Sequence, residues 1–296
     1  MERIAFIINP ISGNKSARKL KSTLPEYIMQ TLDSGQWSAV VTQTKYAGHA
    51  TELARNYAAA GYSAVIAVGG DGTVNEVARG LKDTRTAMGI IPMGSGNGLA
   101  RHLGIPLDVH KAVEMLNHSR VESIDYGLAN DELFACTCGT GFDAVVAEKF
   151  AKSGKRGFMT YLQNIIRLVF TYKSQTYHLT GNGMDETHKA FLITFANADQ
   201  WGNAALIAPH ASLQDGQMDV MIMSSYALWD SLVLAIRLFV GTIDKSPLMH
   251  TLRAEEIFLQ RESAAPFHID GDPKTMNKDI HIRIVRRGLR VLVAKL

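Results

Sequence analysis

The segment AVIAVGGDGTVN, residues 64–75, decides the fold of this chain. Its first five residues are apolar without interruption, which is typical of a strand buried on both faces of a sheet. Val74, Val77, Ala78 and Leu81 then follow at helical spacing. The segment therefore predicts a buried strand, a tight glycine loop and a helix that begins directly after the loop.

The loop Gly69-Gly70-Asp71-Gly72-Thr73 has the composition of a phosphate-binding turn. Glycines let the backbone turn sharply and let its N–H groups approach a phosphate, and the helix directs the positive end of its dipole to the same place. Thr73 can cap the helix or contact a phosphate. Asp71 would repel a bare phosphate, so we expect it to hold Mg²⁺ or a water on that ion. The alternative is a turn without a ligand, but the C-terminal end of a buried strand favours a ligand site.

Two further glycine-containing loops follow predicted strands. PMGSGNG, residues 92–98, comes after a strand at 87–91 and leads into a helix, and NPISG, residues 9–13, follows a strand at 4–8. Three such loops at one edge of a parallel sheet could hold a nucleotide between them. The chain has no Walker A loop and no HRD element, which disfavours a P-loop ATPase and a protein kinase.

Strand and helix signals alternate over residues 1–125, which predicts a mostly parallel sheet covered on both faces. After this point strand signals dominate and predict a sandwich or barrel of antiparallel strands. We therefore expect an α/β nucleotide-binding domain over 1–125 and an all-β domain over 126–287. The last strand signal, within 288–296, is a candidate to join the first domain.

The composition is that of a globular protein, with 46% hydrophobic and 20% charged residues among 296. The net charge of +3 is too small to indicate nucleic acid as a partner. No apolar run reaches the ~18–20 residues needed to cross a bilayer, and no signal peptide is evident, so we expect a cytoplasmic protein. Cys136 and Cys138 match no common zinc spacing. No pair of histidines lies at zinc-ligand spacing with a carboxylate, so we expect the ten histidines to be structural or solvated.

Seven segments, taken in order, carry a resemblance to a known family. They are NPISG (9–13), GGDGTVNE (69–76), PMGSGNGLA (92–100), CGTGFDA (138–144), IAP (207–209), DGQMDV (215–220) and DGD (270–272). With them the chain resembles the diacylglycerol kinase catalytic-domain family, which includes bacterial soluble lipid kinases, sphingosine kinases and ceramide kinases. The resemblance covers nearly the whole chain.

The resemblance implies a Rossmann-like N-terminal domain related to NAD kinase and phosphofructokinase, a C-terminal β-sandwich, and an active site in the cleft. It implies a magnesium ion held by the Asp215 side chain and the backbone oxygens of Ser212 and Gln217, although Asp215-Gly216 also has the composition of a plain β-turn. It implies ATP bound across residues that we assign to Asn9, Thr44, Gly69, Gly70, Asp71, Gly72, Thr73, Val74, Asn75, Gly94 and Ser95.

Two acidic residues are the candidates for catalysis, Asp272 and Asp71. The family places a glutamate at the third position of DGE, and this chain has Asp272 there, one methylene shorter. Phosphoryl transfer needs a carboxylate to accept the hydroxyl proton, and a displacement of ~1 Å can cost ~100-fold in rate. We expect Asp272 to be that base, with Asp270 or water as the alternatives. A second departure is Gly98, where many bacterial diacylglycerol kinases have aspartate.

These features predict an ATP- and Mg²⁺-dependent lipid kinase that acts on diacylglycerol or a sphingoid-type lipid. The alternatives are a small-molecule kinase of the NAD kinase type and a non-catalytic nucleotide or lipid sensor. An apolar helical face within 158–169, flanked by basic residues, could meet a membrane surface transiently, but such a face is more often core. The lipid that is phosphorylated is left open, and so is a homodimer.

Overall fold

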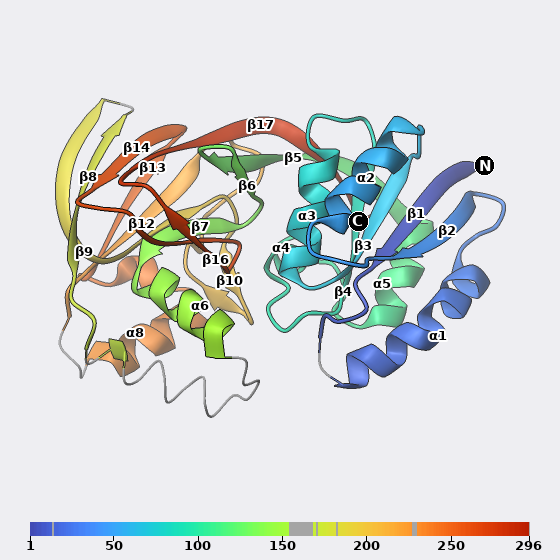
Figure 1. The fold of residues 1–296 in the computed structure, drawn as a ribbon, viewed down its shortest axis with the longest axis horizontal. Coiled ribbons are helices and arrows are strands. Elements are labelled where there is room, and N and C mark those ends of the chain that lie inside the picture. The colour runs from blue at the N-terminus through green and yellow to red at the C-terminus, as the bar shows by residue number, and fades with distance from the viewer. Residues whose placement is uncertain (14, 154–167, 170, 182, 227–229, 296) are drawn as a thin grey trace. The chain divides into compact units, whose positions relative to one another are not determined.

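The computed structural model describes all residues except 14, 154–167, 170, 182, 227–229 and 296 (Figure 1). The chain divides into two compact units. Unit 1 comprises Met1–Tyr126, Gly202–Ala204 and Arg286–Leu296, and unit 2 comprises Gly127–Trp201 and Ala205–Val285. The ranges predicted from the sequence lie within two residues of these, apart from Gly202–Ala204, whose place in unit 1 no sequence signal indicated.

Unit 1 alternates strands and helices. Its elements in chain order are β1 (Glu2–Ile8), α1 (Lys15–Thr31), β2 (Trp37–Gln43), α2 (His49–Ala59), β3 (Ala64–Gly69), α3 (Asp71–Leu81), β4 (Ala87–Pro92), α4 (Gly98–His102), α5 (Val109–Met115), the 3₁₀ helix η1 (Leu116–His118) and β5 (Ser119–Ala129). β5 continues from unit 1 into unit 2.

The first four strands of unit 1 form a parallel sheet in the order β4-β3-β1-β2. β3 and β4 are buried along their whole length, which explains their unbroken apolar sequences. The chain leaves β1 towards β2 on one side and then crosses to β3 on the other. The strand order therefore reverses between β1 and β3, and such a reversal is where ligands gather in open α/β sheets.

The long strand β17 (Asp279–Ala294) completes unit 1. Its last part pairs in parallel with β4, with Val291 opposite Met88, and β17 also pairs with β5. The strand signal within 288–296 thus belongs to unit 1. It is the end of a strand that begins in unit 2 and not a separate strand.

Unit 2 is built mainly of antiparallel strands. Its elements are β6 (Glu132–Phe134), β7 (Thr137–Gly141), α6 (Phe142–Ser153), β8 (Gln175–Gly181), β9 (Met184–Ala196), β10 (Gln200–Gly202), β11 (Ala205–Leu206), β12 (Met218–Ser224), α8 (Asp230–Phe239), the 3₁₀ helix η2 (Ile243–Lys245), β13 (Met249–Ala254), β14 (Glu256–Arg261), β15 (Ala265–Ile269), β16 (Asp272–Met276) and the first part of β17.

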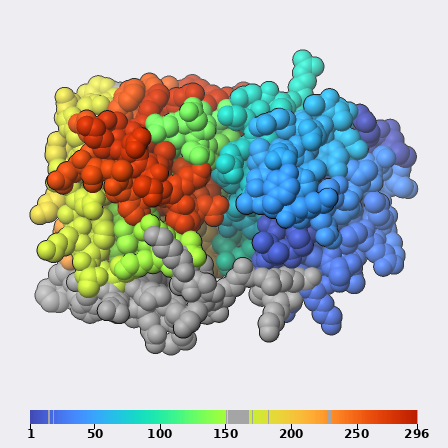
Figure 2. All heavy atoms as spheres, viewed as in Figure 1, coloured from blue at the N-terminus to red at the C-terminus, as the bar shows by residue number. Residues whose placement is uncertain are grey.

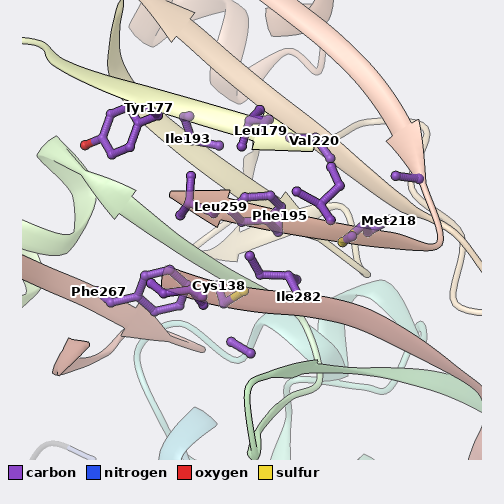
Figure 3. Close-up of a cluster of buried hydrophobic side chains, with 14 of the residues drawn as sticks. Cys138, Tyr177, Leu179, Ile193, Phe195, Met218, Val220, Leu259, Phe267 and Ile282 are labelled. Carbon is purple, nitrogen blue, oxygen red and sulfur yellow. The ribbon is translucent and has the colours of Figure 1, made fainter. Parts of the chain in front are cut away.

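Strand β9 organises unit 2, because it pairs with β8 along its first half and with β7 and β12 along its second half. The strands enclose a core of buried apolar side chains that includes Phe195 of β9, Val220 of β12 and Phe267 of β15 (Figure 3). A second apolar cluster packs beside α8 and includes Leu234. The expected combination of a parallel α/β domain and a β-sandwich domain is confirmed.

One predicted strand was wrong. The sequence indicates a single strand over 133–138, but β6 ends at Phe134 and β7 begins at Thr137. The N–H groups of residues 135–137 donate to the Asp270 carboxylate, so the chain bends around a side chain that lies 135 residues further along.

Candidate functional site

All four parallel strands of unit 1 present candidate residues at the same edge of the sheet. Asn9 follows β1, Thr44 follows β2, the loop of residues 69–73 closes β3, and Gly94 and Ser95 follow β4. The predicted nucleotide-binding residues of unit 1 are therefore brought together at this edge. The loops after β1 and β3 lie where the strand order reverses.

Asn9 joins the loops at that reversal. Its backbone N–H donates to the Val68 oxygen at 3.1 Å, and its side-chain Nδ2 donates to Thr73 Oγ1 at 3.1 Å. Thr73 is 5% exposed, so its hydroxyl is held between the two loops. The first residue of α3 follows Gly70, whose backbone is extended, and no side chain caps the helix. Of the two roles predicted for Thr73, the helix cap is not observed.

The loops after β3 and β4 touch through their backbones. A Cβ atom on Gly94 would lie 2.5 Å from Gly70 Cα, and one on Gly70 would lie 3.1 Å from Gly94 Cα. Both glycines are half-buried, whereas Ser95 is exposed. Glycine is needed here because two main chains approach each other and not because either position requires a positive φ.

We expect Gly94→Ala to lower turnover by about 10–100-fold, because the new methyl group must push the two loops apart and a shift of ~1 Å carries a cost of that order. Steady-state kinetics with varied nucleotide, together with melting curves, would measure it. Gly104→Ala is the control: it places alanine at φ +66° and costs about 1–2 kcal/mol, yet meets no atom within 4 Å. Equal loss of turnover in both variants would trace the effect to stability.

The Asp71 carboxylate links the same two loops. Its Oδ2 accepts the N–H of Asn97 at 2.9 Å, and its Oδ1 accepts the N–H of Gly98 at 2.7 Å. The sequence predicts that Asp71 holds Mg²⁺ or a water on that ion, which stays a prediction, and these contacts show that its carboxylate also joins the two loops. Gly98 is buried beside it, so an aspartate at position 98 would add a second negative charge to a carboxylate already in place.

Asn97 shapes the loop after β4. It has a left-handed backbone, with φ of 52°, and its side chain closes a ring: Oδ1 accepts the N–H of Gly94 at 2.9 Å and Nδ2 donates to the Gly94 oxygen at 3.0 Å. Asparagine tolerates this conformation better than most residues. The sequence reasoning did not assign Asn97 a role, although an asparagine between glycines is a signal for such a turn.

Lys21 of α1 was also missed. Its ammonium group is 4% exposed and donates to the Asn9 oxygen at 2.6 Å, the Ser12 oxygen at 2.7 Å and Ser12 Oγ at 2.6 Å. A buried lysine of α1 thus anchors the loop after β1 through three hydrogen bonds. The signal was present, since Lys21 lies on the helical stripe that buries Leu24 and Ile28.

Glu76 follows the GGDGT loop and serves a neighbouring helix. Its two carboxylate oxygens accept the N–H groups of Gly48 and Ala50 at 2.9 and 3.1 Å, at the beginning of α2. This satisfies N–H groups that a helix N-terminus leaves unpaired. Asn75, predicted to bind nucleotide, is buried, and Val74 is 6% exposed.

In unit 2 the DGD segment forms the turn between β15 and β16. Asp270 and Gly271 have φ of 47° and 85°, and Ile269 pairs with Asp272, which is the geometry of a two-residue hairpin. The Asp270 carboxylate accepts three N–H groups, from Ala135 at 2.8 Å and from residues 136 and 137 at 2.8 and 3.0 Å. This carboxylate is a structural clamp, which counts against Asp270 as the base.

Asp272 has a different environment from Asp270. It begins β16 and is exposed, and β16 lies at the surface on the face seen in Figure 2. An exposed carboxylate at the end of a rigid hairpin can accept a proton from a substrate without disturbing the fold. The hairpin therefore separates an anchoring aspartate from an accessible one two residues later.

The GFDA segment builds a buried polar group in unit 2. Asp143 Oδ2 lies 3.0 Å from His268 Nε2 and accepts the Thr194 hydroxyl at 3.1 Å. A Cβ on Gly139 would come within 3.0 Å of both the aspartate and the histidine. Burial, with the charges of Asp270 and Asp143, raises the pKa of the Cys138 thiol well above its usual range. A thiol in this state is unreactive.

In the turn at Asp215, where the sequence predicts magnesium, the carboxylate is paired with an arginine. Asp215 Oδ1 accepts the Gln217 N–H at 3.0 Å, and Oδ2 forms an ion pair with Arg253, which also binds Asp219 Oδ1 at 3.1 Å. Burial raises the pKa of Asp219, and Arg253 opposes that shift. The oxygen donors of Ser212, Asp215 and Gln217 suit Mg²⁺ by type, but as arranged the carboxylate is already paired. We therefore derive no catalytic step through a metal ion there.

We expect Arg253 and Mg²⁺ to compete for Asp215. Repulsion between a guanidinium and a divalent ion about 4 Å apart is on the order of 2 kcal/mol even in water. Arg253→Gln should therefore lower by about tenfold or more the Mg²⁺ concentration that gives half-maximal thermal stabilisation without nucleotide. Arg290→Gln, which loses only a contact to the Arg85 oxygen, is the control. An identical Mg²⁺ dependence in wild type and Arg253→Gln would show that the turn binds no magnesium.

The apolar face predicted within 158–169 falls largely in residues 154–167, outside the part of the chain that the structure describes. Among the helices that are described, none combines the length and the apolar character that a membrane span requires.

Comparisons with known proteins identify the family that this chain resembles. The family model for the diacylglycerol kinase catalytic domain matches residues 3–129, and that for the YegS C-terminal NAD kinase beta sandwich-like domain matches residues 136–293. The chain is 30% identical to a Pseudomonas putida protein named "Probable lipid kinase YegS-like", over 81% of this chain and 80% of that protein. It is 28% identical to the diacylglycerol kinase of Bacillus subtilis, over 92% and 90%. The crystal structure of a diacylglycerol kinase from Bacillus anthracis superposes with a TM-score of 0.74 at 19% identity, covering 99% of this chain and 97% of that one.

Proposed function

The chain belongs to the diacylglycerol kinase family, and from that premise we propose that it is a lipid kinase that uses ATP with Mg²⁺. It transfers the γ-phosphate to the hydroxyl group of a diacylglycerol or sphingoid-type lipid. The observation that carries the proposal is the convergence of the loops after β1, β3 and β4 of unit 1, joined by Asn9–Thr73 and Asp71–Asn97 hydrogen bonds.

These loops suit the phosphates of a nucleotide. The loop after β3 passes directly into α3, whose first turn has N–H groups that can donate hydrogen bonds to an anion. Gly70 and Gly94 have no side chain that would keep a phosphate from the backbone. Asp71 and Asn97 hold the loops in one arrangement, so less conformational freedom is lost when the nucleotide binds. When bound together with ATP, Mg²⁺ would supply positive charge to the transferred phosphate.

Asp272 supplies the base in this proposal. It accepts the proton of the lipid hydroxyl as that oxygen attacks the γ-phosphorus and the β–γ bridging oxygen leaves with ADP. Its exposure in unit 2 is consistent with access to a substrate. Gly98, which replaces the aspartate of many bacterial diacylglycerol kinases, lies in unit 1, and its N–H donates to Asp71. We therefore propose that this replacement affects the negative charge at the nucleotide loops and not the choice of lipid.

A transfer assay tests the proposal. The chain, labelled ATP and Mg²⁺ are incubated with detergent-solubilised diacylglycerol, monoacylglycerol, sphingoid base, ceramide and phosphatidylglycerol, and the products are resolved by chromatography. Label in one of the lipids is the expected result, and omission of Mg²⁺ should abolish it. Label in NAD alone would assign a small-molecule kinase. ATP binding with no labelled product on any acceptor would assign a sensor, and either of these results would overturn the proposal.

A further inference from the structure

Strands β9 and β13 of unit 2 bring together three side chains that can bind a metal ion. Glu186 and His188 come from β9, and His250 comes from β13. One ligand atom from each lies within 4.8 Å of the other two. His188 Nε2 is 2.8 Å from Glu186 Oε2, and the two imidazole rings have centroids 5.5 Å apart.

The strand pattern explains why these side chains face one another. Alternate residues of a strand lie on the same face, so Glu186 and His188 share the face of Met184 and Ala190, which pack in or against the core of unit 2. On β13, His250 shares the face of Leu252 and Ala254, which contact the same core. The three polar residues therefore lie at the edge of that core, where His188 is half-buried and Glu186 and His250 are exposed to solvent.

We propose that Glu186, His188 and His250 bind a zinc ion. Two imidazole nitrogens and one carboxylate oxygen are a donor set that suits zinc, and imidazole is a poor ligand for magnesium. Two ligands at positions i and i+2 of one strand are already aligned, so the ion has to recruit only His250. Water completes the coordination.

This zinc site would join β9 to β13, which lie on opposite sides of β12. It is separate from the Asp215 turn, whose donors are all oxygens. The site does not depend on kinase activity, so it can fail or succeed without bearing on the proposed function. Sequence spacing gave no indication of it, because His188 and His250 are 62 positions apart and no zinc motif contains them.

Isothermal titration with zinc chloride tests the site on the full chain, purified without a histidine tag and stripped with EDTA. We expect one zinc per chain, and a rise of about 5–10 °C in the melting temperature of unit 2 when free zinc is 100 times Kd. The same concentration of Mg²⁺ should not reproduce the rise. His188→Gln and His250→Gln should each weaken zinc binding at least about tenfold, since even residues that merely support a metal ligand cost that much.

His281→Gln is the matched control. His281 also pairs with a glutamate, Glu256, on neighbouring strands of unit 2, but within the described residues it belongs to no group of three ligands. Its zinc affinity should equal that of the wild type. Equal affinity in all three histidine variants, or equal weakening in all three, would mean that zinc binds adventitiously and would overturn the assignment.

Discussion

Asp71→Asn should remove at least 99% of turnover and lower the melting temperature of unit 1. One side-chain oxygen becomes an NH₂ group that faces the backbone N–H of Asn97 or Gly98, so one bond is lost and two donors oppose each other. A buried group left unpaired costs about 1–3 kcal/mol, or roughly 2–4 °C in melting temperature for each kcal/mol. The loops proposed to hold ATP would separate as a result, so nucleotide affinity should fall together with kcat.

Asp83→Asn is the matched control for this variant. Asp83 also lies in unit 1 and accepts a hydrogen bond, from the Tyr126 hydroxyl at 3.0 Å, but it is not part of the loops. It should lose some stability and keep its turnover. If Asp71→Asn retained more than a tenth of wild-type kcat, under about 1.4 kcal/mol would be lost in the transition state, which is too little for a residue that positions both loops.

The same substitution at Asp270 and Asp272 should give opposite results. Asp270→Asn disturbs an acceptor of three backbone N–H groups and should lower the melting temperature of unit 2 by several degrees or more. Asp272→Asn changes an exposed residue and should leave the melting temperature within about 1 °C. It should lower kcat by about 10²–10⁴-fold, the usual contribution of a general base, with ATP affinity nearly unchanged.

Melting curves, kcat and ATP affinity for both variants decide between the roles. Asp272→Glu restores the length of the family's glutamate and should be active. Wild-type turnover in Asp272→Asn would end the mechanism and leave the fold assignment as it is. Wild-type stability in Asp270→Asn, with a large loss of kcat, would transfer the role of base to Asp270.

The loops of unit 1 could be predicted from sequence because each is local. Gly69–Thr73 follows an unbroken apolar strand and precedes a helical stripe, so the strand, turn and helix are encoded within 18 residues, 64–81. The role of Asp71 could not be predicted in the same way. Its partners are backbone N–H groups 26 and 27 residues away, and every residue type except proline supplies such a group.

Unit 2 illustrates the same limit with a larger separation. Asp270-Gly271 is recognisable as a turn, but the three N–H groups that its aspartate binds lie more than 130 residues earlier and carry no side-chain signal. The zinc ligands on β9 and β13 are hidden for a related reason. Which strands become neighbours depends on the topology of the whole sheet, whereas spacing along the chain reports only local pairs.

The passage of β17 from unit 2 into unit 1 has a consequence for synthesis on the ribosome. Residues 286–296, which pair with β4, emerge only after the whole of 127–285 has been made. At 5–20 residues per second this interval is about 8–30 s. During it the edge of β4 has no neighbour beyond β3, and such an edge invites pairing with other chains. The edge of β4 in nascent unit 1 therefore stays open to such pairing until the last strand arrives, and a fragment ending near residue 126 would keep that edge exposed.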